Sequence, residues 1–354
     1  MWPKVSIIWL NYNSIKIMPV VMESLESVTN LDYPEDRYEL IVVDNGSTDG
    51  SFEKIKEYVE RKQSLRKKII KLDRNLGFTG GNNIGFRARD RESKYVLLLN
   101  NDAVLLQEGL KTLVEYAENN PRIAGLQGVI LRYKTRFIDT AGDYIDEMLI
   151  THLLGAGHEY PWVLRKPVYI TYVDGSCALY RVESVVKCLG DKLFIDEFFA
   201  YGDDNVLGLM LWNCGYKLVG IPEVVASHAR GFSFGRKRGS LAHYLVERGR
   251  YAPPYITNSR YRKLIPLRAL RNIATSILRG NPDGSAFTET RAFIDGVRLG
   301  KKLRGKGIFI DLYRAPIVRI PLKHLPRFFT AKQLIYDYFE KWFIRNMDFL
   351  TVEH

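Results

Sequence analysis

The sequence has few cysteines and no long apolar run, and each shortage excludes something. Its 354 residues include three cysteines, Cys177, Cys188 and Cys214, and none forms a CxxC pair. An odd count without paired spacing predicts neither a disulfide framework nor a zinc knuckle, and it favours a reducing, cytoplasmic setting. No window approaches about 18 uninterrupted apolar residues, so no membrane-spanning helix is expected. The opening residues also lack the basic-then-apolar layout of a signal peptide.

Acidic residues are scarce in the last third of the chain. Residues 236–354 contain 24 Lys and Arg against 9 Asp and Glu, a net charge of +15. Residues 1–235 contain 28 and 31, a net charge of −3. This asymmetry predicts a near-neutral domain over 1–235 and a basic, mainly helical region over 236–354, each with its own partners. Neither region contains a recognisable nucleic-acid-binding module, so nucleic acid is not an expected partner.

Short apolar runs alternate with helical patterns over the first 130 residues. The runs predict strands at 5–10, 38–44, 67–73, 95–100 and 124–133. Alternation of this kind is typical of an α/β fold, in which a mostly parallel sheet is covered by helices on both faces. From about 135 to 172 the pattern weakens, and a mobile region over the site is expected there.

Glycine is missing after the first strand, where NYNSIKIM stands. A Rossmann dehydrogenase needs GxGxxG at that place, so this class is disfavoured. Polar residues instead follow the first four strands, in NYN, DNGSTDG, RNLGFTGGNN and NND. Because the carboxyl ends of parallel strands share one edge of a sheet, that edge is the predicted binding site.

Three features at this edge have a binding interpretation and a plainer one. Asp44 could accept hydrogen bonds from a ribose or a base, or it could form the turn before a capped helix. The glycines of NLGFTGGNNIG (75–85) would let the backbone and a helix N-terminus approach a diphosphate, or they could make a flexible turn. Asp102 suits Mg²⁺ or Mn²⁺ bridging a diphosphate, or it caps the next helix.

Two later features are also ambiguous when taken alone. Asp203 and Asp204 lie together ahead of an apolar stretch, where a raised pKa would suit a general base. The plainer interpretation is a charged helix N-terminus. His228 follows an apolar run, and a lone histidine is more often structural than a ligand.

In this order, the motifs resemble those of the family-two glycosyltransferases, which have the GT-A fold, and most closely the rhamnosyltransferase-like members. The matching stretches are VSIIWLNYN, VVDNGSTDGS, NLGFTGGNNIG, LLLNNDAVL and FIDEFFAYGDDNVLGLMLWNCGYKLVGIPEVVASH. They span residues 4–235. The resemblance implies a mixed, mostly parallel GT-A sheet between helices. It also implies an inverting, metal-assisted transfer of a hexosyl or deoxyhexosyl group from a nucleoside-diphosphate sugar, in polysaccharide biosynthesis.

The resemblance also implies roles for single residues on the donor side. Asn11 and Asp44 would contact the base and ribose, and Tyr12 would belong to the same nucleotide-binding set. The positions along the nucleotide and diphosphate would be Asn75, Gly77 and Asn82.

The metal and the acceptor hydroxyl would be handled by the later motifs. Asp102 would bind Mg²⁺ or Mn²⁺, and His228 would help to hold the metal or the diphosphate. Asp204 would be the general base, with Asp203 in the position usually held by Glu.

Some positions depart from the family pattern. Asn100 replaces the first acid of the metal motif, so the metal site has less negative charge. Val206, Met210 and Trp212 replace a second Asp and two Arg, and we expect these positions to shape the acceptor side. Two rival functions therefore remain: a non-catalytic sugar-nucleotide-binding protein of the same fold, and another nucleotide-using α/β enzyme.

The basic region contains two amphipathic stretches. Residues 261–280 place one apolar set near one helical face: Leu264, Leu267, Leu270, Ile273, Ala274, Ile277 and Leu278. Residues 331–346 cluster the aromatic residues Tyr336, Tyr338, Phe339, Trp342 and Phe343. Such helices can lie on an anionic membrane face, where the acceptor would be a lipid-linked sugar rather than a free glycan. Alternatively, they pack on the catalytic domain or on a second copy in a homo-oligomer.

Overall fold

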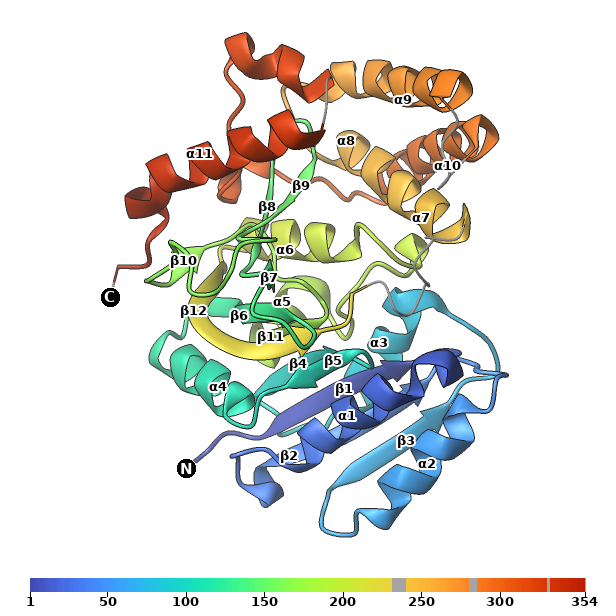
Figure 1. Ribbon diagram of the computed structural model, residues 1–354, viewed down its shortest axis with the longest axis vertical. Helices are drawn as coiled ribbons and strands as arrows, with labels where there is room; N and C mark the ends of the chain where they lie inside the picture. Colours follow the sequence, from blue (N-terminus) through green and yellow to red (C-terminus); the bar gives the residue numbers. More distant parts are fainter. Residues whose placement is uncertain (231–239, 280–284, 330–331, 354) are drawn as a thin grey trace.

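The structure, a computed structural model, describes residues 1–230, 240–279, 285–329 and 332–353. Its first part alternates strands with crossover helices (Figure 1). The strands are β1 (Val5–Asn11), β2 (Tyr38–Asp44), β3 (Lys67–Lys71) and β4 (Tyr95–Asn100). The helices are α1 (Met18–Thr29), α2 (Ser51–Arg61) and α3 (Gly77–Ala88). β1 pairs in parallel with β2 and with β4, and β2 pairs in parallel with β3. All four strands were predicted from the sequence.

The second part extends the sheet beyond β4. Its strands are β5 (Ala103–Leu105), β6 (Ile123–Arg132), β7 (Ile138–Thr140), β10 (Val168–Tyr169), β11 (Cys177–Arg181) and β12 (Lys217–His228). Its helices are α4 (Gly109–Asn119), α5 (Val182–Leu189) and α6 (Asp203–Asn213). In the described residues the strand order is β10-β12-β6-β11-β4-β1-β2-β3, with β11 antiparallel to both of its neighbours. The predicted mixed α/β sheet is therefore confirmed.

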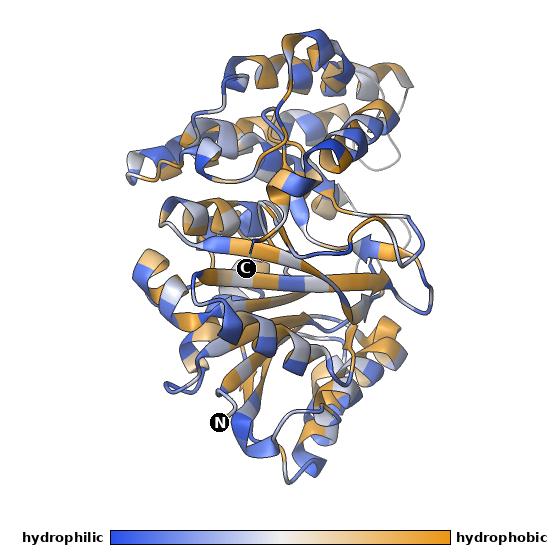
Figure 2. Cartoon of the chain, turned by 90° about the vertical axis from the view of Figure 1, so that its left-hand side faces the viewer, coloured by the Kyte–Doolittle hydropathy of each residue, from blue (hydrophilic) through white to orange (hydrophobic). Residues whose placement is uncertain are grey.

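Both faces of the central sheet are buried. Along β1, Ile7 and Trp9 point into one core, and Ile8 points into the other. Successive side chains of a strand face opposite sides of the sheet, so a strand covered on both sides is apolar at nearly every position. Figure 2 shows this as orange running along the strands. The continuous apolar runs of the sequence have this physical cause.

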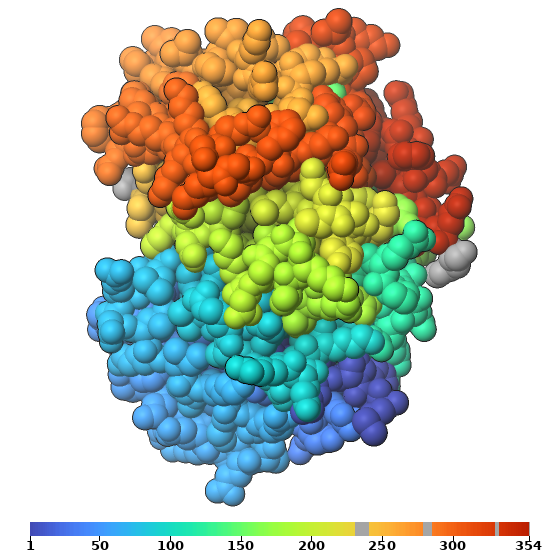
Figure 3. Space-filling view, turned by 180° about the vertical axis from the view of Figure 1, so that it is seen from behind, coloured from blue at the N-terminus to red at the C-terminus, as the bar shows by residue number. Residues whose placement is uncertain are grey.

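The described residues from 240 onward form a helical layer over one end of the molecule, orange to red in Figures 1 and 3. The helices are α7 (Ser240–Tyr251), α8 (Pro253–Ile256), α9 (Ile265–Arg279), α10 (Ala286–Gly305) and α11 (Lys332–Leu350). A 3-10 helix, η6 (Leu322–Phe329), precedes α11. The predicted helical character of this basic region is confirmed.

The expectation of a mobile region at 135–172 is wrong. This segment contains β7 and a hairpin of β8 (Asp143–Ile145) and β9 (Thr151–Leu153), and residues 138–150 are all buried. The hairpin fits between the sheet and the helical layer. Because such short strands are enclosed on several sides, they show neither of the regular periodicities by which a sequence is read.

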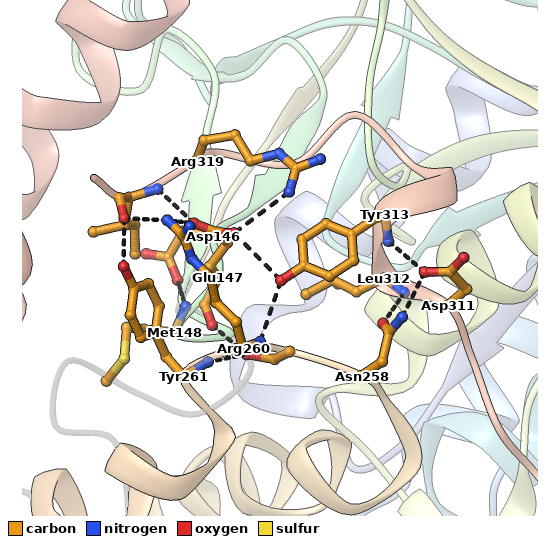
Figure 4. Close-up of polar contacts among 12 residues, drawn as sticks. Asp146, Glu147, Met148, Asn258, Arg260, Tyr261, Asp311, Leu312, Tyr313 and Arg319 are labelled. Carbon is orange, nitrogen blue, oxygen red and sulfur yellow. Dashed lines mark hydrogen bonds and ion pairs between the residues drawn. The ribbon is translucent and has the colours of Figure 1, made fainter. Parts of the chain in front are cut away.

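Buried polar contacts join this segment to the helical layer (Figure 4). The carboxylate of Glu147 is fully buried and accepts a hydrogen bond from the backbone N–H of Ile320 at 2.7 Å. It also pairs with the guanidinium groups of Arg260 at 2.8 Å and Arg319 at 3.5 Å. The hydroxyl of Tyr313 donates to the same carboxylate at 3.3 Å. The Glu147 carboxylate thus contacts four residues of the C-terminal part of the chain and joins that part to residues 138–150.

The aromatic residues of α11 serve the same junction. The rings of Phe339, Trp342 and Phe343 surround Tyr144 of β8 at centroid distances of 5.7–5.9 Å. Phe339 and Phe343 are almost completely buried. This aromatic cluster therefore packs on β8, within the first 235 residues, which agrees with the interpretation that these helices pack on the rest of the chain.

The expectation about the cysteines is also wrong. Cys188 and Cys214 form a disulfide that joins the end of α5 to the residue after α6, and Cys177 is buried. The sequence separation of 26 residues matches no motif, so only the packing of the two helices brings the thiols together. The cysteine-based argument for a reducing setting is thereby removed.

Candidate functional site

Amide and carboxylate groups interlock at the carboxyl ends of β1, β2 and β4. The Asn11 side-chain NH₂ donates to Asp44 at 2.8 Å, and the Asn11 side-chain oxygen accepts from Asn101 at 3.0 Å. The second oxygen of Asp44 accepts from the backbone N–H of Ser47 at 2.9 Å, a turn-forming bond. Asp44 and Asn11 are fully buried, whereas Tyr12 is 46% exposed. In this structure, Asp44 orders the turn that leads to Ser47. Of the three residues expected to contact the base and ribose, Tyr12 is the one that is exposed to solvent.

The glycine-rich loop is held by its own amides. Asn75 accepts a hydrogen bond from the backbone N–H of Gly77 at 2.7 Å and another from the Asn45 side chain at 2.9 Å. Gly77 has φ +76°, and a Cβ there would lie 2.2 Å from the carbonyl oxygen of Phe199. Only glycine fits such a position. The side chain of Asn82 donates to the carbonyl oxygen of Phe78 within its own helix.

The N-terminus of α3 is partly satisfied within the protein. The backbone N–H of Thr79 donates to the carbonyl oxygen of Phe199 at 3.1 Å, so this group is not available to an anion. The side chain of Asn83, which sequence reasoning did not single out, donates to the carbonyl oxygen of Phe194 and to Asp196 at 2.8 Å each. The loop therefore also positions the segment that leads to α6.

His228 lies between two carboxylates. It ends β12, where it pairs with Ala103 of β5 and so reaches Asp102. The ring nitrogen Nε2 is 3.1 Å from Asp102, and Nδ1 is 3.0 Å from Asp139. Burial lowers the pKa of His228, but hydrogen bonds to the two acids outweigh it and raise the pKa to about 9. The imidazole is therefore protonated near neutral pH and donates to both carboxylates.

Arg230 continues this chain of charges. Its guanidinium group contacts Asp139 at 2.7 Å and Asp174 at 2.7 Å. Burial alone would raise the pKa of the Asp174 carboxyl, but the neighbouring Arg230 guanidinium holds that pKa below its ordinary value. Asp139, Asp174 and Arg230 were missed by the sequence reasoning. Two of them had a signal in the sequence. Arg230 lies two residues after His228, and Asp174 begins the stretch DGSCALYR, in which the strand pattern resumes.

A divalent metal fits this site only if the substrate supplies most of its ligands. Among the described residues, no group of three or more His, Cys, Asp or Glu side chains converges as metal ligands would. Asp102 offers one donor, and Nε2 of His228 offers a second only when a bound cation displaces its proton, while Asp139 lies on the other side of the ring. Mg²⁺ is commonly held by one or two carboxylates together with phosphate oxygens and water. The donor set thus suits an ion that arrives with a diphosphate.

Asp203 and Asp204 begin α6, directly after Gly202. One carboxylate oxygen of each is buried and has no hydrogen-bond partner among the described residues. Burial raises the pKa of Asp203 to about 6. Burial, with the nearby charges of Asp203 and Asp174, raises the pKa of Asp204 well above its ordinary value. A carboxylate with these properties is a suitable proton acceptor near neutral pH.

Gly175 brings the two halves of the site together. A Cβ at this position would lie 2.8 Å from Oδ1 of Asp204, so the backbone approaches that carboxylate closely. Gly175 follows Asp174, which Arg230 links through Asp139 to His228. Asp102 and Asp204 are therefore the two ends of one connected set of polar groups.

Two of the three replaced positions after Asp204 have buried side chains. Val206 is 1% exposed and Trp212 is 6% exposed, and the indole N–H of Trp212 donates to the carbonyl oxygen of Ile170 at 3.0 Å. The expectation of a role on the acceptor side is wrong for Val206 and Trp212, because both belong to the core under α6, and it stays a prediction for Met210. A surface hollow lined by Trp2, Tyr33 and Lys111 lies near the amino ends of β1 and β2, away from this edge.

The sheet order and the polar residues at the carboxyl ends of its strands define a mixed α/β fold, whose family comparison with known proteins identifies. The profile of glycosyl transferase family 2 matches residues 6–189, which is more than half of the chain. The chain therefore belongs to glycosyl transferase family 2. The resemblance noted from the sequence is confirmed at the level of the family.

Named relatives are distant. A dolichyl N-acetyl-alpha-D-glucosaminyl phosphate 3-beta-D-2,3-diacetamido-2,3-dideoxy-beta-D-glucuronosyltransferase of Methanococcus voltae is 23% identical over 228 residues, 63% of this chain and 66% of the relative. An uncharacterized glycosyltransferase of Methanocaldococcus jannaschii is 31% identical over 145 residues, 41% of this chain and 46% of the relative. The match thus spans less than two thirds of each relative's length.

Solved structures share the fold. GalNAc-T7 with UDP, GalNAc and Mn²⁺ has a TM-score of 0.60 at 14% identity, over 87% of this chain and 55% of that one. The mannosyltransferase PcManGT of Pyrobaculum calidifontis, with GDP-Man and Mn²⁺, has a TM-score of 0.50 at 17% identity, over 98% and 88%. These likenesses confirm the GT-A fold. Among the helices that the structure describes, none combines the length and apolar character that a bilayer crossing requires.

Proposed function

We propose that the protein transfers a hexosyl or deoxyhexosyl group from a nucleoside-diphosphate sugar to a hydroxyl of a glycan or lipid-linked acceptor, with inversion. Family membership supports glycosyl transfer. Two structures of the same fold hold a nucleoside diphosphate or its sugar together with Mn²⁺. The name of the Methanococcus voltae relative describes a lipid-phosphate-linked sugar acceptor.

One observation carries the proposed mechanism: an oxygen of Asp204 is buried without a hydrogen-bond partner among the described residues, at the start of α6. In our mechanism this carboxylate takes the proton of the acceptor hydroxyl. The acceptor oxygen then forms a bond to the anomeric carbon as the bond from that carbon to the diphosphate oxygen breaks. Attack from the face opposite the nucleotide inverts the anomeric centre. A positioned general base of this kind contributes roughly 10²–10⁴-fold in rate.

The donor would lie along the other end of the polar edge. Tyr12 is exposed beside Asn11 and Asp44, where a base could stack on its ring. Asn75, Gly77 and Asn82 would border the diphosphate. Asp102 and His228 would hold Mg²⁺ or Mn²⁺, which when bound would stabilise the charge of the departing diphosphate.

The deciding experiment compares donor binding with turnover in one variant. Asp204→Asn should reduce transfer by at least about 100-fold. The same variant should retain the thermal stabilisation that a nucleoside diphosphate and Mn²⁺ give to the wild type. Asp191→Asn, at an exposed partner of Arg89, is the matched control and should leave both properties unchanged. Full transfer by Asp204→Asn would contradict the assignment of the base.

A non-catalytic sugar-nucleotide-binding protein is the second candidate. Asn100 in place of the first acid of the metal motif favours it, because an amide adds no charge to hold an ion. Turnover of a nucleoside-diphosphate sugar distinguishes the two candidates. The second is supported if a nucleoside diphosphate stabilises the wild-type protein but the protein neither hydrolyses the donor nor transfers its sugar. The other rival, a nucleotide enzyme that uses NAD, would be stabilised by NAD instead.

Finer parts of the proposal follow the sequence resemblance. We place the catalytic domain at 1–235 and the basic region at 236–354, and the protein in polysaccharide biosynthesis at the cytoplasmic side of a membrane. The rhamnosyltransferase-like loop favours a deoxythymidine- or uridine-diphosphate donor. Thermal stabilisation by UDP, dTDP and GDP, each with Mn²⁺, Mg²⁺ or EDTA, would identify the base and the dependence on metal.

A further inference from the structure

Helix α9 presents four of its large apolar side chains to solvent, although Ile265 at its start is buried. Its inward face consists of Ile265, Ala269 and Ser276, which are all buried. Its outward face, here called the α9 stripe, has four side chains that are each more than half exposed: Leu267, Leu270, Ile277 and Leu278. Spacings of three, seven and one place them on one side of the helix. A helix that only packs on its own protein would show the opposite arrangement, with large apolar residues inward.

Positive charge borders the α9 stripe. The exposed residues Arg262 and Lys263 precede the helix, and no Asp or Glu occurs between Glu247 and Asp283 in the sequence. The start of η6 lies beside this end of α9, because the hydroxyl of Tyr261 donates to the carbonyl oxygen of Ile320 at 2.7 Å. There the exposed Leu322 and Lys323 add one more apolar and one more basic side chain.

The position of α9 leaves its stripe accessible to a large flat partner. Figure 1 shows α9 at the upper end of the long axis, and α2 and β3 at the opposite end. Figure 3, from behind, shows the orange and red residues covering that same upper end.

We propose that this end of the molecule docks on an anionic lipid bilayer, with the α9 stripe inserted among the acyl chains and the flanking basic residues at the headgroups. Exposed leucines and isoleucines on a helix with basic flanks are the features of an interfacial amphipathic helix. Each Lys or Arg near an anionic surface adds attraction that salt weakens. The proposal goes beyond the proposed transfer reaction, since docking needs neither donor nor acceptor.

A second copy of the chain fits the same surface less well. A two-fold interface places one patch against itself, so Arg262, Lys263 and Lys323 would face basic groups across the contact. Like charges opposed at an interface weaken it. Nucleic acid would satisfy the charges but would leave the four apolar side chains of the α9 stripe without a partner.

The test is flotation of the full-length protein with vesicles of phosphatidylcholine, with and without phosphatidylglycerol, at low and high salt. We expect binding to the anionic vesicles alone, weakened by salt. The stripe variant, Leu267→Ser, Leu270→Ser, Ile277→Ser and Leu278→Ser, should bind about 100-fold more weakly. Its thermal stability should match the wild type, because the substituted side chains are exposed.

Two further variants make the result specific. Phe309→Ser with Phe349→Ser removes exposed apolar side chains elsewhere and should change binding by less than about twofold. Arg262→Gln and Lys263→Gln should each weaken binding to anionic vesicles by about fivefold, and they test the surface even if the stripe variant misfolds.

Four outcomes would overturn the proposal. The first is that the wild type does not float with anionic vesicles at low salt, and the second is that the wild type and the stripe variant float equally. The third is that light scattering shows a wild-type dimer that is lost in the stripe variant, with no vesicle binding by either. The fourth is that the protein binds an oligonucleotide but not vesicles. Loss of transfer activity leaves this measurement intact, so failure of the proposed function is distinguishable from failure of docking.

Discussion

Removing the carboxylate of Glu147 should loosen the attachment of the helical layer. In Glu147→Ala, the buried N–H of Ile320 loses its acceptor at 2.7 Å, which costs about 1–3 kcal/mol. The side chains of Arg260 and Arg319 are 49% and 56% exposed, so in the variant water solvates both guanidinium groups. The loss of their two ion pairs with Glu147 therefore adds only about 1 kcal/mol. The deleted methylene groups leave a small cavity. The total destabilisation is roughly 3 kcal/mol.

Thermal unfolding measures this effect. For a chain of this length, a destabilisation of that size lowers the midpoint by roughly 4 °C. Glu183→Ala is the matched control, because Glu183 pairs with Lys187 on the surface and both side chains are more than 60% exposed. The control should change the unfolding free energy by less than about 0.5 kcal/mol. If Glu147→Ala unfolds at the control's temperature, the junction does not depend on this carboxylate.

Three further predictions concern other contacts. Gly175→Ala places a Cβ 2.8 Å from Asp204, so turnover should fall at least about tenfold while stabilisation by nucleoside diphosphate persists; unchanged turnover would remove Gly175 from the site. The hydrogen bond to Glu289 raises the pKa of His243 above 6.5, so its stabilisation is complete below pH 6.5 and disappears as pH rises through the folded pKa. Unfolding free energy followed from pH 6 upward should therefore decline less in His243→Gln, and parallel curves would contradict this. Cys188→Ser opens a loop of 26 residues and should lower stability by roughly 3.5 kcal/mol under non-reducing conditions, with no difference from wild type under reductant.

The parallel part of the sheet could be predicted because its physical cause is local. β1, β2 and β4 are buried on both faces, so each shows as an apolar run followed by polar residues, whereas β3, at the end of the strand order, keeps only a short apolar pair between lysines. The antiparallel strand β11 and the pairing of β12 with both β5 and β6 depend on which distant segments meet. The apolar pattern of a single sequence does not show which of these distant strands pair.

The candidate site divides in the same way. Asp102, Asp204 and His228 were found because each belongs to a longer motif. Asp139 was not found, because it lies on a strand of three residues with no pattern around it, and its importance comes from its contact with His228. The disulfide was missed for the same reason, since the distance between two thiols is a property of helix packing and not of spacing.

The junction at Glu147 also sets how far the chain can be shortened. The family profile ends at residue 189, yet the backbone N–H of Val352 donates to the carbonyl oxygen of Pro167, and Thr351 bridges to β10 at the edge of the main sheet. Cutting after residue 235 would uncover a buried acid, the ring of Tyr144 and a sheet edge together. A shortened chain that stops at residue 235 would therefore lose contacts to β10 and to the segment around Glu147 that residues outside the family match supply.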